Sequence, residues 1–326
     1  FAVTEYFGIK MIPVPMLKTG PDMDLIERLI GDEAVKGCWC VPKYSNPTGV
    51  TYSDETVRRF ARLRPAAKDF RIMWDNAYCI HEFEGEYVPF PDILEICAKA
   101  GNPDMVFEFA STSKVTLPGA GVACFACSLD NMAYMEKLLT VQVISFDKVN
   151  QQRHVLYLQN KAHTLELMKK HAAIMGPKFR AVLDALDQEI APLEIASWQR
   201  PKGGYFVSLN AMPGTAKRTL ALCKEAGVTM TNAGATFPCG KDPQDSNILN
   251  HGVLLPRRRL AAQMGGGHLQ NIAVVPEDVA GLLHHGLELV LGAERVLQIH
   301  HGKSLLCRCC GSILHPGPPI VIEPLV

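Results

Sequence analysis

Three short motifs hold the residue types in this sequence that could do chemistry. The first places Lys114 directly after Ser111, Thr112 and Ser113, so that a lysine amine follows two serine hydroxyl groups. A deprotonated lysine amine attacks carbonyl carbons, and desolvation or a nearby cation favours that form. Because the neighbours of Lys114 are apolar or small, we expect its amine to be shielded from water. This motif predicts a lysine that binds a carbonyl compound covalently.

The other two motifs supply a carboxylate and further polar side chains. Asp75 and Tyr78 follow one apolar run, and Asn46 lies in an Asn-Pro-Thr-Gly turn after another. A carboxylate can keep a pyridine nitrogen protonated, which makes the ring an electron sink, and Asn46 and Tyr78 can bond a ring oxygen. Ser111 and Ser113, with backbone N–H groups, can bind a phosphate. Together these groups meet the needs of pyridoxal phosphate.

An apolar, strand-like run precedes each motif. The predicted strands of the first region cover residues 37–41, 71–74, 105–110 and 122–126. Helical patterns separate them, one beginning after the N-cap candidate Ser53 and one over residues 91–100. Strands that alternate with helices predict an α/β fold with a mostly parallel sheet. The carboxyl ends of such strands share one edge, where ligands bind, so we expect the three motifs to meet there.

The second region is predicted to be a smaller α/β domain. Its predicted elements are helical stretches over residues 147–161 and 165–189, a strand over 203–209, a helix over 215–226 and a final strand over 228–231. After Ile248 the composition changes, with clustered histidines and a single lysine. We therefore expect a large domain over residues 1–146, an interdomain helix and small domain over 147–248, and an atypical, frameshifted or disordered tail over 249–326.

Composition excludes several classes of protein. The chain has 326 residues and a formal net charge of zero, so no electrostatic footprint for nucleic acid or an anionic membrane is present. No apolar run is long enough to span a membrane. Most of the eleven cysteines lie in apolar runs, without the paired spacing of a zinc site, which predicts free thiols, no metal and a cytoplasmic, reducing compartment.

Four further residues are expected to have structural roles. The tryptophans Trp39, Trp74 and Trp198 are predicted to lie in the core or at a domain interface. His81 is predicted to be a packed or surface histidine rather than a base.

The motifs and their order resemble class I (fold type I) pyridoxal-phosphate aminotransferases, in the branch that includes aspartate aminotransferase-like and MocR-type enzymes. The stretches that carry this resemblance are residues 41–49, 74–78, 111–114, 147–154 and 200–206. The resemblance implies a fold type I large domain with a partial sheet, followed by a small C-terminal α/β domain. It also implies transfer of an amino group between an amino acid, with aspartate as the candidate, and a 2-oxo acid, and a homodimer of the complete parent protein.

The resemblance also implies roles for the site residues. Lys114 would be the Schiff-base lysine and would then move the proton as general base and acid. Asp75 would pair with the pyridinium nitrogen, and Tyr78 and Asn46 would bond the ring oxygen. The phosphate would be bound by Ser111 and Ser113.

Departures from the family pattern keep other readings open. Val122 and Leu249 stand where family members carry arginines for the phosphate and for the substrate carboxylate. The chain begins at Phe1, and the family's N-terminal third, with its phosphate loop, would precede it. The alternatives are a lyase, the ligand-sensing domain of a transcription regulator, and an inactive aminotransferase fragment. For the change near codon 249 we expect a frameshift, a misjoined exon or a gene-prediction error, with genuine divergence as the alternative.

Overall fold

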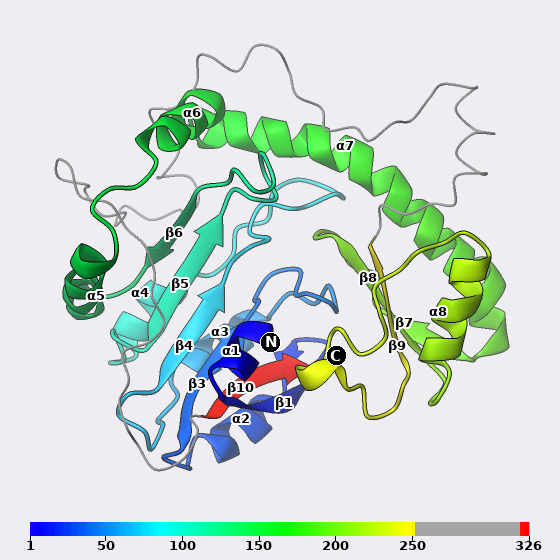
Figure 1. Cartoon of the computed structure of the whole chain (residues 1–326), viewed down its shortest axis with the longest axis horizontal. Coiled ribbons are helices and arrows are strands. Elements are labelled where there is room, and N and C mark those ends of the chain that lie inside the picture. The colour runs from blue at the N-terminus through cyan, green and yellow to red at the C-terminus, as the bar shows by residue number, and fades with distance from the viewer. Residues whose placement is uncertain (252–319, 326) are drawn as a thin grey trace.

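The computed structural model describes residues 1–251 and 320–325. Within these residues there are a seven-stranded sheet and a three-stranded sheet. In Figure 1 the large sheet lies at the left and the small sheet at the right, and the long helix α7 (Lys161–Ala185) runs along the top from one to the other. The large sheet is built from β1 (Lys10–Leu17), β2 (Gly20–Pro21), β3 (Val35–Cys40), β4 (Arg71–Asp75), β5 (Val106–Ser111), β6 (Ala123–Ala126) and β10 (Ile320–Leu325). The helices before α7 are α1 (Ala2–Tyr6), α2 (Met23–Leu29), α3 (Asp54–Ala61), α4 (Ile93–Lys99), α5 (Leu129–Gln142) and α6 (Lys148–Leu158).

The large sheet is mixed but mostly parallel, with the order β2-β1-β10-β3-β4-β5-β6. The neighbours β3, β4 and β5 run parallel, whereas β6 runs antiparallel to β5. The predicted strands lie within one or two residues of the observed ones. The α/β fold with a mostly parallel sheet is therefore confirmed.

Strand β10 comes from the region that the sequence assigned to an atypical tail. It pairs in parallel with β1 on one side and with β3 on the other. The rest of that tail from residue 252 to 319, together with residue 326, lies outside the described residues. Of the predicted tail, residues 249–251 continue strand β9 (Asn247–His251) of the small sheet and residues 320–325 form a strand of the large sheet, and its character as an atypical, frameshifted or disordered segment stays a prediction.

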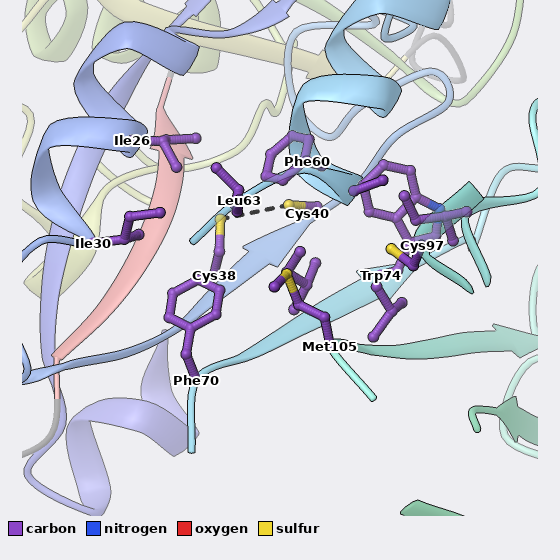
Figure 2. Close-up of a cluster of buried hydrophobic side chains, with 14 of the residues drawn as sticks. Ile26, Ile30, Cys38, Cys40, Phe60, Leu63, Phe70, Trp74, Cys97 and Met105 are labelled. Atoms are coloured by element: carbon purple, nitrogen blue, oxygen red, sulfur yellow. Dashed lines mark hydrogen bonds between the residues drawn. The ribbon is translucent and has the colours of Figure 1, made fainter. Parts of the chain in front are cut away.

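The main core lies between the large sheet and helices α2, α3 and α4. Trp74 of β4 is fully buried there, with ring centroids 5.6 Å from Phe60 and 5.8 Å from Tyr52 (Figure 2). Edge-to-face contacts of this kind add to the free energy gained by burying the rings. The core placement predicted for Trp74 is confirmed.

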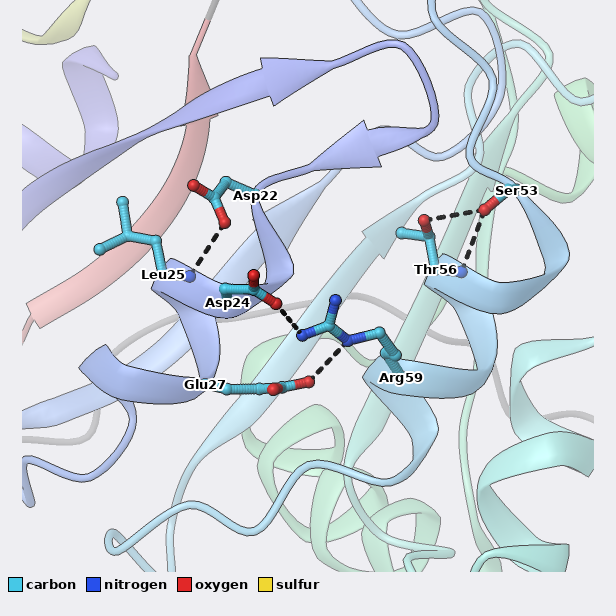
Figure 3. Close-up of polar contacts among 7 residues, drawn as sticks. All are labelled: Asp22, Asp24, Leu25, Glu27, Ser53, Thr56 and Arg59. Carbon is cyan, nitrogen blue, oxygen red and sulfur yellow. Dashed lines mark hydrogen bonds and ion pairs between the residues drawn. The ribbon is translucent and has the colours of Figure 1, made fainter.

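Local side-chain hydrogen bonds begin the helices of this layer. The side chain of Ser53 accepts a hydrogen bond from the Thr56 N–H at 3.2 Å, which confirms the predicted N-cap of α3. On the neighbouring helix α2, Asp22 has the same role, and Arg59 of α3 binds Asp24 and Glu27 of α2 (Figure 3). These contacts set the register between the two helices.

The small sheet contains β7 (Ala196–Trp198), β8 (Phe206–Ala211) and β9 (Asn247–His251), in that order and all antiparallel. Helix α8 (Ala216–Glu225) follows β8, as predicted. The predicted strand over residues 228–231 is wrong, since these residues form no strand. Within the described residues the small sheet is formed by β7, β8 and β9, and residues 228–231 pair with neither of its edge strands.

Candidate active site

The carboxyl ends of β4 and β5 bring two of the three motifs together. Strand β4 ends at Asp75, which lies opposite Phe109 of β5, and β5 ends at Ser111, three residues before Lys114. The Lys114 ammonium lies 4.9 Å from the centroid of the Tyr78 ring, and its charge acts on the Asp75 carboxylate. The predicted grouping of Lys114, Asp75 and Tyr78 is present in the structure.

Asp75 is a half-buried carboxylate with cationic and N–H neighbours. Burial raises the pKa of Asp75, while the charge of Lys114, the Ala77 N–H and the Trp39 side chain lower it. A cation placed on this carboxylate would remove the cost of burying its charge. Asp75 is therefore suited to bind a protonated ring nitrogen.

Trp39 is a site residue that its sequence position did not reveal. We expected a core or interface residue, but Trp39 is 38% exposed and its indole bonds Asp75. Its ring lies parallel to that of Phe109, with 6.5 Å between centroids. Trp39 is thus a neighbour of the Asp75 carboxylate, on the adjacent strand β3, that lowers the pKa of that group.

Tyr78 is almost fully buried, with 2% of its surface exposed. Burial, with the negative charge of Asp75 as the second cause, raises the pKa of Tyr78 well above its ordinary value. The side chain therefore stays a neutral phenol, able to donate a hydrogen bond to an anionic oxygen.

Lys114 lies in the turn after β5, and its side chain is exposed. The prediction that apolar and small neighbours in the sequence would shield the Lys114 amine from water is therefore wrong. Sequence neighbours do not decide exposure here: Val115 is buried in a small core cluster, whereas Lys114 is exposed although its amine lies over the Tyr78 ring.

Two serine hydroxyls lie beside this turn, as the phosphate prediction requires. The Ser111 hydroxyl donates to the Ser113 hydroxyl at 2.9 Å and accepts from the Ser113 N–H at 3.0 Å. A Cβ on Gly121 would lie only 2.7 Å from the Ser113 Oγ, so glycine is needed for this close approach. The hydroxyls and the glycine form a polar cradle at the end of β5.

Asn46 does not have the contacts with the other site residues that its predicted role requires. It lies in the loop after β3 with its side chain exposed, and the described contacts do not join it to Lys114 or Asp75. Its neighbour Tyr44 is buried and packs with Tyr78. The loop therefore reaches the site, but a role for Asn46 stays a prediction.

The two departures from the family pattern also lie at the site. The Val122 N–H donates to the Thr112 hydroxyl at 2.9 Å, which connects β6 to the lysine turn. Leu249 of β9 is 6% exposed and packs with Tyr44 and Tyr78. Position 249 thus borders the site, with an apolar side chain where an anion-binding cation would be expected.

Two residues that were not predicted to belong to the site, His81 and Tyr205, contact the lysine backbone. The His81 Nε2 donates to the Lys114 carbonyl oxygen at 3.2 Å, and the Tyr205 hydroxyl donates to the same oxygen at 3.1 Å. His81 is 4% exposed, so the prediction of a packed histidine is confirmed. Its position soon after the Asp75–Tyr78 motif was the only signal in the sequence.

Comparison with known proteins finds relatives that are named aminotransferases. The family model described as aspartate amino-transferase matches residues 1–267. An aminotransferase of Mycolicibacterium smegmatis is 50% identical over 76% of this chain and 58% of its own length. The aspartate aminotransferase of Corynebacterium glutamicum is 42% identical over 82% of this chain and 62% of its own. The chain thus spans about six tenths of these relatives.

A solved structure agrees with the sequence matches. The crystal structure of an aspartate transaminase from Corynebacterium glutamicum superposes with a TM-score of 0.77, at 42% identity, over 79% of this chain and 61% of that one. Within the described residues of our structure, no helix has the length and apolar content needed to cross a membrane. The fold, the site and the matches together show that the chain belongs to the aspartate aminotransferase family.

Proposed function

We propose that this chain forms the lysine-bearing part of a pyridoxal-phosphate-dependent aminotransferase, which moves an amino group between an amino acid and a 2-oxo acid. The observation that carries the proposal is the grouping at one sheet edge of the Lys114 amine, the Asp75 carboxylate and the Tyr78 phenol. The names of the relatives support the reaction class, and that of the Corynebacterium glutamicum enzyme supports aspartate as the amino donor.

The residues present fit pyridoxal phosphate. The cradle beside Gly121 offers two hydroxyls for a phosphate, and Asp75 offers an anion for a ring nitrogen. When bound, the cofactor supplies an electron sink that stabilises negative charge on the substrate carbon. In our proposal Ser111 and Ser113 bind its phosphate, and Tyr78 and Asn46 bind its ring oxygen.

The chain's own proton chemistry centres on Lys114. Its Nζ would hold the cofactor and, once displaced by the substrate amine, would act as general base and then general acid in the 1,3-proton shift, taking the proton from the substrate α-carbon and delivering it to a carbon of the cofactor. Asp75 would keep the ring nitrogen protonated, and the Trp39 side chain would hold that carboxylate in place. The exposed amine is accessible for each of these steps.

The remaining assignments follow from the same proposal. The domain limits are 1–146 for the large domain and 147–248 for the interdomain helix and small domain, and the complete parent protein is a cytoplasmic homodimer.

A second candidate function is a chain that binds the cofactor but turns over slowly. Buried Leu249 favours this candidate, because an apolar side chain cannot pair with a substrate carboxylate.

The proposal is tested by half-reactions of the cofactor-loaded chain. We expect aspartate to convert the bound cofactor to its amine form and release the matching 2-oxo acid, monitored by absorbance and by product analysis. Asp75→Asn should slow this conversion far more than it weakens cofactor binding, because it removes the charge that maintains the electron sink. Conversion with Lys114→Ala at the wild-type rate would contradict the proposal, and cofactor binding without conversion would favour the second candidate.

A further inference from the structure

The backbone carbonyl of Lys114 accepts two hydrogen bonds from distant parts of the chain. Tyr205, just before β8 of the small sheet, donates its hydroxyl at 3.1 Å, and His81, in the turn after β4, donates Nε2–H at 3.2 Å. Within the lysine turn itself, the N–H groups of Val115 and Thr116 bond the Thr112 carbonyl. The Lys114 carbonyl is therefore restrained by groups from outside the turn.

His81 is suited to donate to this carbonyl. Because a carbonyl oxygen only accepts, the hydrogen must lie on Nε2, which selects one tautomer of the neutral ring. Burial lowers the pKa of His81 to about 4, so the ring is neutral near pH 7. Among the described residues no partner reaches the buried Nδ1, which leaves the Lys114 carbonyl as the polar contact of this ring.

The two donors are also fixed to each other. The Gly204 N–H donates to the His81 carbonyl at 2.9 Å, and the ring centroids of His81 and Tyr205 lie 5.5 Å apart. A Cβ on Gly203 would lie 2.4 Å from the His81 carbonyl oxygen, so the two segments are in direct backbone contact. The Tyr78 ring, 5.6 Å from that of His81, completes the group.

We infer that His81 and Tyr205 are positioning residues for Lys114, and we name the pair the carbonyl clamp. By holding the Lys114 carbonyl, the clamp sets the direction in which the lysine side chain leaves the turn, toward Tyr78 and Asp75. Because Tyr205 leads into β8, the clamp also couples the placement of the small sheet to the lysine. The inference rests on the proposed role of Lys114 as the cofactor-binding lysine.

The first test needs no cofactor. Amide hydrogen exchange is measured by mass spectrometry on the full cofactor-free chain, for wild type, Tyr205→Phe, His81→Phe and His81→Gln. Tyr134→Phe, on the exposed face of α5, is the matched control. Loss of one donor should speed exchange at Val115 and Thr116 about tenfold, as expected for one hydrogen bond, while α7 is unchanged. His81→Gln keeps an N–H donor and should restore most of the protection.

The second test measures orientation at Lys114. Tyr205→Phe and His81→Phe should slow covalent capture of pyridoxal phosphate about tenfold, whereas acetylation of Lys114 by acetic anhydride should stay within about twofold of wild type. Wild-type exchange rates in both variants would overturn the clamp, as would a His81→Gln variant as impaired as His81→Phe. If wild type captures no cofactor, the proposed function fails, and the exchange data still decide the clamp.

Discussion

The middle and the carboxyl end of strands β3 to β5 differ in what surrounds them. In the middle, Cys38, Ile72 and Trp74 are fully buried among apolar side chains. At the carboxyl end, Asp75 is half-buried and Lys114 is exposed. The same strands thus separate the groups that stabilise the fold from the groups proposed to do chemistry. Substitutions at the two positions should therefore have different effects, on unfolding in one case and on cofactor capture in the other.

The largest expected effect comes from substituting a tryptophan in each region, Trp74 in the buried middle of the strands and Trp39 near the carboxyl end of β3. Trp74→Ala should lower the free energy of unfolding by about 3–5 kcal/mol, because it empties a fully buried ring site. Trp39→Phe, at the exposed end of β3, should change it by less than about 1 kcal/mol and yet weaken cofactor capture, because its contact to Asp75 is lost. Urea denaturation measures the first quantity and absorbance titration the second. Equal stability losses in both variants would break the comparison.

The sequence predicted the positions of the strands and the motifs at their ends better than the contacts between motifs. Alternating apolar runs and helical patterns place strands β3 to β5, and a polar motif after an apolar run marks each carboxyl end. Contacts across the chain leave no local pattern: His81 and Lys114 are 33 residues apart, and Tyr205 and Lys114 are 91 apart. Only the folded chain shows that they meet.

The errors have the same origin. The stretch over residues 228–231 has strand-forming residues, but strand propensity does not decide whether a segment pairs with a sheet in the folded chain. Trp39 was expected in the core or at a domain interface, but it is 38% exposed, because alternate residues of a strand face opposite sides. In each case the deciding fact was a neighbour from elsewhere in the chain.

Glu108 lies on β5 between the buried middle of the strands and their carboxyl ends. Its titration shows whether the buried region extends to this side chain. On β5 it is 8% exposed and accepts a hydrogen bond from the Asn76 side chain at 2.9 Å, and burial raises the pKa of Glu108 to about 7. Between pH 4.5 and 7 the folded chain then holds a proton that the unfolded chain has released. Stability from this group therefore falls as pH rises through that window, by on the order of 3 kcal/mol.

Glu108→Gln should remove this pH dependence, because an amide does not titrate. His81 acts in the opposite direction, since burial lowers the pKa of His81 to about 4 and the unfolded chain binds the extra proton below pH 6.5. The measurement is therefore the difference between variant and wild type in urea stability at pH 4.5, 6 and 8. A difference that stays constant across this range would contradict a buried, titrating Glu108.

A smaller effect is expected where the small-sheet segment meets the site. Gly203→Ala places a methyl group 2.4 Å from the His81 carbonyl oxygen and 2.5 Å from the Tyr44 ring, and should cost about 1–3 kcal/mol of stability. Gly31→Ala, whose nearest contact is at 3.3 Å, is the control. If the two variants melt alike, residues 202–206 do not lie against the site as described.

The smallest effect is expected outside both regions, on the helical surface. Arg59→Ala removes the ion pairs to Asp24 and Glu27 between α3 and α2, in which Arg59 is 32% exposed. Exposed pairs contribute little, so the Tm should shift by less than about 3 °C and cofactor capture should not change. A larger shift by calorimetry would show that helix contacts, as well as the buried strand centres, stabilise this layer.

The central claim is that Lys114, at the carboxyl end of β5, is the residue that binds the cofactor. The most direct measurement is peptide mapping by mass spectrometry after the full chain is incubated with pyridoxal phosphate and reduced with borohydride. We expect a single stoichiometric adduct, on Lys114, that is lost in Lys114→Ala and retained in the control Lys137→Ala. An adduct distributed over surface lysines, or one of equal yield in Lys114→Ala, would contradict it.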